Sequence, residues 1–174
     1  MGRNRFVNRL TGKEIRRNDP VDEEVVFEGG VMITETDREG FITYANKKFQ
    51  EMTGYSKEDL IGVSHSIIRH PDMPKGAFRS MWKTLSEGKV WRGYVKNLRK
   101  DGRYYWVLVY AQPKYDENGN VIGYIAGRKI ADPERVEEIE KIYAEHHGDE
   151  FIDADVFECQ YDEYLRNGKV ESGE

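Results

Sequence analysis

The sequence predicts an α+β fold in which a five-stranded antiparallel sheet carries helices on one face and is followed by one further helix. Two hairpin signals, Asp101-Gly102 and Asn118-Gly119, separate three runs rich in aromatic and β-branched residues. Such dipeptides supply the positive φ values that tight hairpin turns need. An earlier pair of strands and a helical stretch precede this three-stranded meander, and the helices must cover one face of the combined sheet.

The first strands are expected at residues 31–36 and 41–45, on either side of a turn at 37–40. Asn46 then caps a helix that runs to residue 52 and is stopped by Gly54. Ser56 begins a second short helix, because an acidic residue three positions later completes a capping box.

A longer amphipathic helix is expected over residues 75–87 and is ended by Gly88. Its apolar stripe consists of Ala77, Phe78, Met81, Trp82 and Leu85. The meander strands follow at residues 90–99, 104–113 and 121–130.

The chain divides into four segments by composition and charge. Residues 1–26 form a basic N-terminal cap or tail, residues 27–131 the domain, residues 132–148 a C-terminal helix and residues 149–174 an acidic tail. Asp132-Pro133 suits a helix start, with Asp at the cap and Pro in the first turn. Within the acidic tail, a short amphipathic helix over residues 157–165 is compatible with docking to a partner.

The charge is strongly polarised along the chain. Residues 1–17 hold six Lys/Arg and one acid, whereas residues 132–174 hold four bases and 15 acids. Two interpretations stay open: the ends attract one another or partners, or both are solvated and frayed. The net charge of −5 and the lack of a base-reading motif argue against nucleic-acid binding.

Composition sets the broad class. The 174 residues suffice for one core, the single Cys159 excludes a disulfide scaffold, and no apolar run approaches the roughly 20 residues of a membrane span. The basic N-terminus lacks the apolar region of a secretory signal. We therefore expect a cytoplasmic protein without a membrane span.

The order of elements, with the segment Gly54-Tyr55-Ser56-Lys57-Glu58-Asp59-Leu60-Ile61-Gly62 after the first helix, resembles a PAS domain over about residues 27–131. A sharper motif is Ile68-Arg69-His70-Pro71-Asp72-Met73-Pro74-Lys75, followed by Trp82, Trp91, Lys96-Asn97 and Tyr105-Trp106. This series closely resembles the FAD-binding PAS domain of bacterial aerotaxis receptors. The resemblance implies a flavin-based redox or oxygen sensor of energy taxis, with FAD favoured over FMN.

The residues themselves agree with a flavin pocket. Flavin needs flat apolar walls, which Trp82 and Trp91 can provide, and an amide partner for its polar edge. Asn97 lies six residues after Trp91 and so shares its strand face. The resemblance implies that the Asn97 amide binds the pyrimidine edge. Alternatively, both tryptophans are ordinary core residues.

The resemblance implies that the segment around Arg69, His70 and Asp72 borders the cofactor. Arg69 would contact a phosphate or the ring, and His65 would lie near the reactive edge. For Asp72, capping of the following helix is an equally good interpretation.

Two further residues have both a local and a cofactor interpretation. The resemblance implies that Asn46 lies near the cofactor, although the sequence also makes it a helix cap. It likewise places Tyr105 in the pocket, although an aromatic cross-strand pair explains that residue equally well. Reduction of the flavin is expected to rearrange hydrogen bonds of Asn97 or His65 and to move the sheet relative to its flanking segments.

Other chemistries find less support. A light-driven cysteine adduct needs a Cys inside the domain, haem ligation needs a His on the helix at 75–87, and neither is present. The four histidines lack zinc-site spacing, so no metal is expected, and no phosphate-binding glycine motif or nucleophile–base set occurs. We interpret the chain as a sensor and not as an enzyme.

Aerotaxis receptors continue into a membrane anchor and a signalling coiled coil, and this sequence contains neither. We therefore expect a stand-alone PAS protein that signals to a separate chemoreceptor-type transducer, with a homodimer as one arrangement. The alternatives are a cofactor-free PAS module that dimerises or assembles partners, and a sensor for a kinase partner. A flavin enzyme is a third class that no motif indicates.

Overall fold

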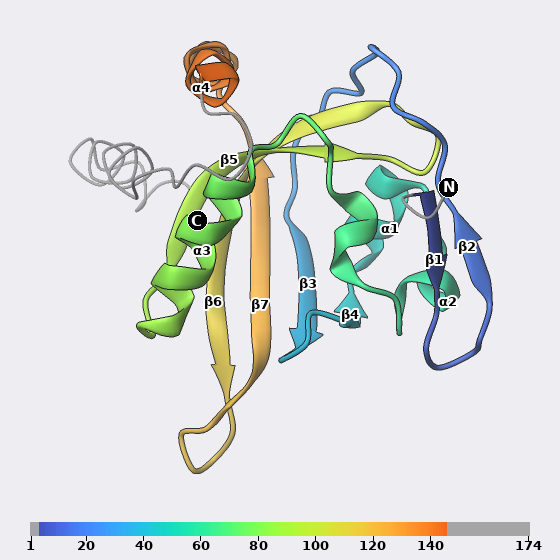
Figure 1. Cartoon of the computed structure of the whole chain (residues 1–174), viewed down its shortest axis with the longest axis vertical. Helices are drawn as coiled ribbons and strands as arrows, with labels where there is room; N and C mark the ends of the chain where they lie inside the picture. The colour runs from blue at the N-terminus through green and yellow to red at the C-terminus, as the bar shows by residue number, and fades with distance from the viewer. Residues whose placement is uncertain (1–3, 146–174) are drawn as a thin grey trace.

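The computed structural model describes residues 4–145 and is built around one antiparallel sheet (Figure 1). Its five strands lie in the order β4-β3-β7-β6-β5. Their bounds are Met32–Asp37 (β3), Ile42–Ala45 (β4), Trp91–Leu98 (β5), Tyr104–Tyr115 (β6) and Val121–Ile130 (β7). The predicted α+β fold with a five-stranded antiparallel sheet is confirmed, and the early strand pair joins the meander through β3 and β7.

Both predicted hairpin turns are present. Gly102, with φ of 92°, lies between β5 and β6, and Gly119, with φ of 82°, lies between β6 and β7. Strand β6 extends two residues beyond the predicted Pro113, because its pairing with β7 continues through an irregularity to Tyr115.

Four helical segments connect the two parts of the sheet: α1 (Lys47–Thr53), α2 (Lys57–Leu60), the 3-10 helix η2 (His65–Ile68) and α3 (Lys75–Ser86). The predicted caps are confirmed, since the side chain of Asn46 accepts from the Phe49 N–H and that of Ser56 from the Asp59 N–H. Capping of α3 by Asp72 is wrong. Pro74 occupies that N-cap position, and no side chain caps the helix.

Figure 1 shows α3 in front of the sheet, where it packs on β5 and β6, while α1 packs on β3. We call the side covered by these helices the inner face. Register places Trp91 opposite Ala111 and Asn97 opposite Tyr105, so these four residues point to the same side. The largest fully buried side chains include Phe49, Leu60 and Ile67 from the helices and Met32, Ile42 and Tyr105 from the sheet.

The basic N-terminal segment forms an ordered hairpin of β1 (Arg5–Val7) and β2 (Glu14–Arg16). Asn8 between them is fully buried, and its amide donates to the carbonyls of Asp59 (3.1 Å) and Ile61 (2.7 Å). A Cβ at Gly62 would lie 2.4 Å from the Asn8 oxygen, so the hairpin packs directly on the loop after α2. Residues 4–26 are therefore not a frayed terminus.

The last described element is α4 (Pro133–Glu145), which confirms the predicted helix start. Its Tyr143 hydroxyl donates to the Tyr94 carbonyl (2.6 Å), and its ring stacks on Trp106 with centroids 6.3 Å apart. Because Trp106 follows the inner-face residue Tyr105 on a strand, α4 packs on the outer face. The predicted end of this helix, the acidic tail and Cys159 lie outside the described residues. None of the described helices has the length and apolar character needed to cross a membrane.

Candidate functional site

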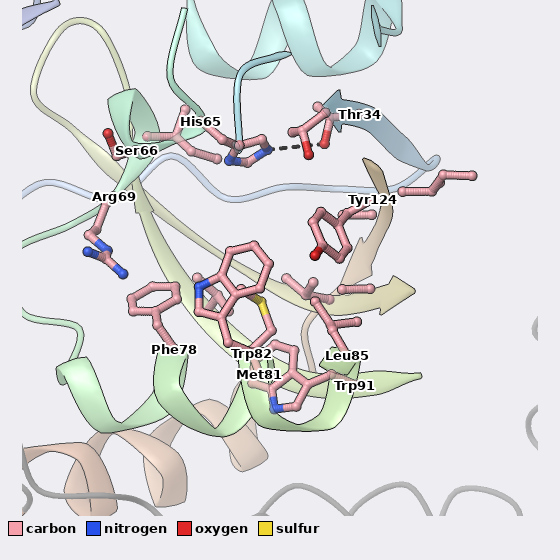
Figure 2. Close-up of a pocket in the computed structure, with 18 of the residues that line it drawn as sticks. Thr34, His65, Ser66, Arg69, Phe78, Met81, Trp82, Leu85, Trp91 and Tyr124 are labelled. Atoms are coloured by element: carbon pink, nitrogen blue, oxygen red, sulfur yellow. Dashed lines mark hydrogen bonds between the residues drawn. The ribbon is translucent and has the colours of Figure 1, made fainter. Parts of the chain in front are cut away.

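A cavity of about 250 Å³ lies between α3 and the inner face of the sheet. Figure 2 shows its walls, to which η2, α3 and the strands β3, β5, β6 and β7 contribute. The floor is formed by small or branched residues that leave space above the strands, namely Val95, Val109, Ala111 and Ala126. The cavity thus exists because the sheet carries small side chains where α3 carries large ones.

Aromatic side chains line the cavity from two directions. Trp91 on β5 is 2% exposed and forms part of the interior wall, whereas Trp82 on α3 is 43% exposed and lies at the rim. The Trp82 ring meets Tyr124 of β7 edge-on, with centroids 5.0 Å apart. A planar ring system bound here would have an apolar wall and an aromatic rim.

Asn97 supplies an amide to the same cavity. It is buried on β5, directly opposite Tyr105 of β6. Burial raises the pKa of Tyr105 to about 12, although the nearby charge of Arg128 opposes that rise. An amide group has two donors and an acceptor oxygen, so contact with one tyrosine leaves most of this capacity for a ligand.

A polar cluster of His65, Arg128 and Thr34 borders the cavity on another side. The Nη2 of Arg128 lies 2.8 Å from Nε2 of His65, and the Thr34 hydroxyl lies 3.1 Å from the same nitrogen (Figure 2 shows the second contact). Arginine can only donate, so Nε2 is the acceptor and the neutral imidazole carries its proton on Nδ1. Burial, aided by the charge of Arg128, lowers the pKa of His65 to about 3.

Arg128 brings a positive charge into this environment. It is 3% exposed, and burial lowers its pKa only to about 10, so it stays protonated at neutral pH. Among residues 4–145 no carboxylate pairs with it, and its guanidinium instead lies 5.0 Å from the centroid of the Phe49 ring. A buried cation next to neutral groups favours negative charge on whatever fills the cavity.

Arg69 marks one end of the cavity. Its guanidinium lies 3.9 Å from the Phe78 ring centroid, and Figure 2 shows both side chains on the side away from Tyr124 and Leu85. Within the described part of the chain, no acidic side chain pairs with Arg69. Partial burial lowers the pKa of Arg69. Its side chain nevertheless stays exposed to solvent at this end of the cavity.

The structure brings five of the nine predicted site residues into the cavity wall: His65, Arg69, Trp82, Trp91 and Asn97. The other four lie outside this wall. The Asn46 side chain caps α1 and accepts from the Ile33 N–H (3.0 Å), and Tyr105 lies on the inner face opposite Asn97 without lining the cavity.

His70 and Asp72 belong to a separate cluster. The ammonium of Lys96 lies 2.9 Å from the Asp72 carboxylate, which helps to lower the pKa of Asp72, and His70 accepts from the Asp72 N–H (3.0 Å). Asp72 also lines a separate cavity with residues of α4, and the His70 ring meets Tyr104 edge-on.

Sequence reasoning missed Thr34, Tyr124 and Arg128 as site residues. The period of two along residues 121–130 was the available signal, because it places Tyr124, Ala126 and Arg128 on one strand face. An arginine on a strand face that is otherwise apolar and buried indicates a charge with a specific partner or ligand.

A family model described as the PAS fold matches residues 42–126. The aerotaxis receptor of Escherichia coli (strain K12) is 39% identical over 128 residues, which are 74% of this chain and 24% of the receptor. The chain contains a PAS domain. Strand β3 precedes the matched residues and pairs with β4 and β7 in the same sheet.

A second curated protein and a solved structure are also similar. The nitrogen fixation regulatory protein of Klebsiella pneumoniae is 32% identical over 102 residues, or 59% of this chain and 21% of that protein. The dark structure of the blue-light photoreceptor Aureochrome1 LOV superposes with a TM-score of 0.57 at 21% identity, covering 66% of this chain and 86% of that one. The chain spans about a quarter or less of the length of these two curated relatives.

The PAS cavity fits a flavin ring in its chemistry. Apolar rings form the walls, the Asn97 amide can pair with the mixed donor and acceptor edge of the ring, and Arg128 offers a positive charge. In residues 4–145 no three His, Cys, Asp or Glu side chains come together as a metal site would require. The volume lies slightly below the usual range for ligand pockets, about 300–1,000 Å³, so it suits a ring system and not a whole dinucleotide.

Proposed function

We propose that this protein is a cytoplasmic flavin-based redox or oxygen sensor that binds FAD in the cavity under α3. The observation that carries the proposal is the meeting of three features in one PAS cavity. These are the indole of Trp91, the amide of Asn97 and the His65–Arg128 pair.

FAD is favoured over FMN by the motif around Arg69, which resembles the FAD-binding aerotaxis PAS domain. Arg69 supports this choice physically, because a guanidinium at the end of the cavity is well suited to a phosphate group. FMN is the alternative, since it carries a phosphate as well.

A bound flavin supplies reversible electron uptake, and the side chains of the cavity set the conditions for it. The walls of Trp91, Val95 and Val109 exclude water and so strengthen every charge interaction inside. Arg128 stabilises added negative charge, and the neutral His65 holds its Nδ1 proton ready as a donor. A change in the ligand's charge then shifts the hydrogen bonds of His65 and Asn97.

The residues around the cavity also separate this proposal from light sensing by cysteine chemistry. None of the described side chains that line the cavity is a cysteine. A photochemical bond to a cysteine would need that nucleophile against the ring. Redox sensing requires no such group, and we propose a sensor and not an enzyme.

The signal would pass to a separate chemoreceptor-type transducer, with a kinase partner as the alternative. Support comes from the names of the relatives, which are a receptor for aerotaxis and a nitrogen fixation regulator. Helix α4 is the element best placed to pass the signal to a partner, because it follows β7 directly in the sequence and packs on the outer face of the sheet.

The test is a visible absorbance spectrum of freshly purified protein, before and after reduction, with the released cofactor identified by chromatography. We expect a flavin spectrum that bleaches on reduction. The Asn97→Ala variant should retain at least tenfold less flavin, because it loses amide hydrogen bonds worth about 1 kcal/mol each. Gln112→Ala removes an exposed amide from β6 and serves as the control. A colourless protein that takes up no added flavin would instead indicate a cofactor-free interaction module.

A further inference from the structure

We propose that a second cavity, between the N-terminal hairpin and Arg69, is the subsite for the adenosine part of FAD. This inference rests on the proposed flavin function and adds a part of the chain that precedes the PAS match. The second cavity, which we call the hairpin cavity, has a volume of about 320 Å³. Its lining comes from the hairpin and the segment after η2: Asn4, Phe6, Arg17, Pro20, Ser66, Arg69 and Pro71.

The hairpin cavity adjoins the ring cavity. Ser66 and Arg69 line both of them, and Figure 2 shows these two residues at the same end of the ring cavity. A molecule whose ring fills the first cavity and whose tail passes Arg69 therefore enters the second. The ring cavity alone, at about 250 Å³, is too small for a dinucleotide, so the remaining part must lie elsewhere.

The charges of the hairpin cavity fit a diphosphate. Two arginines, Arg17 and Arg69, line it, and no acidic residue is among the described lining residues. Because the buried Arg17 guanidinium donates to the Ile67 carbonyl (2.8 Å), Arg69 is the one that would bind a phosphate. Arg69 stands where the cavities join, which is where the phosphates of a dinucleotide would lie between its two ring systems. Guanidinium groups bind phosphate through paired hydrogen bonds.

Its other groups fit a purine. The ring of Phe6 is partly buried, and the Arg17 guanidinium lies 5.0 Å from its centroid. Aromatic rings and arginine planes are the surfaces on which nucleobases stack. Pro20 adds a second apolar surface. The Asn4 amide is engaged within the protein, because it donates to Asp19 and accepts from Arg17, so it holds the Arg17 plane beside Phe6.

A third cavity of about 460 Å³ is a poorer choice. It lies between Pro71, Lys96 and α4, and it shares no lining residue with the ring cavity. Its two lysines, Lys75 and Lys96, are offset by the carboxylates of Asp72 and Glu140, and Lys96 already pairs with Asp72 (2.9 Å). Size alone would favour this cavity, whereas connection and charge favour the hairpin cavity.

The experiment compares the affinities of the apoprotein for FAD, FMN and riboflavin. The wild type should bind FAD at least tenfold more tightly than FMN. Phe6→Ala should weaken FAD by about tenfold, the loss expected for one stacked base, and leave FMN and riboflavin unchanged. Phe6→Leu keeps apolar packing in the hairpin but removes the aromatic ring, so it should also lose most of the preference for FAD over FMN. It serves as a second variant in case Phe6→Ala disturbs the folding of the hairpin.

Hydrogen exchange supplies a second measurement. FAD should slow amide exchange in residues 4–20, and FMN should not. Equal affinity of the wild type for FAD and FMN, or equal weakening of all three ligands in Phe6→Leu, would overturn the adenosine subsite and leave the flavin sensor intact. Failure of all three flavins to bind the wild type would instead refute the flavin function itself.

Discussion

At the scale of single residues, the buried Arg128 sets the electrostatics of the site. It faces His65 at 2.8 Å and has no acidic partner among residues 4–145. The cost of burying an unpaired cation is large, and a folded domain retains such a group when a ligand or mechanism uses it. In the proposed sensor, that use is to favour a ligand carrying an extra electron.

We predict that Arg128→Met lowers the midpoint potential of the bound flavin by on the order of 60 mV, equivalent to a tenfold loss for one electron. The reason is the loss of a positive charge beside the ring in a poorly solvated cavity. A redox titration followed by absorbance measures it. Arg92→Met on the outer face removes the same charge as a control and should leave the potential within experimental error. Identical potentials in the two variants would contradict this role.

His65 makes folding stability depend on pH. Its pKa is lowered from 6.5 to about 3 in the fold, so below pH 6.5 the unfolded chain binds a proton that the folded chain does not. Stability therefore falls as pH drops from about 6.5 toward 3. At pH 5 the loss from this residue is about 2 kcal/mol relative to neutral pH.

Urea unfolding of the wild type and of His65→Asn at pH 7.5 and pH 5 measures this contribution. The variant should lose about 2 kcal/mol less between the two values. The free energy of unfolding of the variant should still decrease between pH 7.5 and pH 5, because burial, aided by the charge of Lys96, also lowers the pKa of His70 to about 4. An unchanged pH dependence in His65→Asn would mean that His65 is accessible to protons in the fold.

At the scale of elements, the N-terminal hairpin holds one wall of the ring cavity in place. Arg17 of the segment after β2 is buried, and its guanidinium donates to the carbonyls of Ile67 (2.8 Å), Arg69 (3.3 Å) and Ser66 (3.4 Å). These carbonyls end η2, where helix geometry leaves acceptors unsatisfied. The hairpin thereby fixes the position of His65 and Arg69 at either end of that segment.

Arg17→Met should lower the free energy of unfolding by about 2–3 kcal/mol, because it leaves buried carbonyls without a charged donor. It should also speed flavin release by loosening η2. Arg16→Met, at an exposed position on β2, is the matched control and should change neither quantity. Denaturant unfolding and the rate of fluorescence recovery on dilution measure the two effects. A variant as stable as the control would show that the Arg17 contacts add nothing.

The elements also show which parts of the fold were accessible from sequence. Turns and caps such as Gly102, Asn46 and Ser56 act locally, so their residues predicted the strands and short helices well. The hairpin of residues 5–16 was missed because its stability comes from distant contacts, such as Asn8 with the loop after α2. Short strands of three residues leave little periodic signal.

The candidate site follows the same division. Asn97 and Trp91 were predicted to share a face because side-chain alternation in a strand is local. The predicted cap by Asp72 was wrong because its carboxylate accepts from Lys96 and does not bond the N-terminus of α3. That contact depends on the position of β5 beside residues 69–74, which the local sequence does not reveal. Arg128 was missed because only the packing of β7 beside η2 reveals its contact with His65.

At the scale of the whole molecule, the sheet separates the ring cavity on its inner face from α4 on its outer face. Ile139 and Tyr143 bury α4 against the strands, and Tyr143 bonds the Tyr94 backbone of β5. A signal from the cavity can therefore reach α4 through β5 and β6, or along β7, which leads directly into α4.

We predict that Tyr143→Phe lowers the free energy of unfolding by about 1 kcal/mol and weakens the attachment of α4. Tyr115→Phe, at a half-exposed position on β6, should have no effect. Limited proteolysis after residue 131, in the oxidised and the reduced protein, measures the attachment directly. In the wild type the two redox states should differ in cleavage rate, and in Tyr143→Phe this difference should shrink. Equal cleavage of both states in the wild type would exclude α4 as the output.

The adjacent residues Tyr105 and Trp106 of β6 point to opposite faces of the sheet and so connect its two sides. Tyr105 lies opposite Asn97 on the inner face, and Trp106 stacks on the ring of Tyr143 on the outer face. One peptide unit thus connects the two surfaces, and a small rotation of it would tilt both rings in opposite senses. Such a rotation in β6 would carry a message outward without a hinge or a mobile loop.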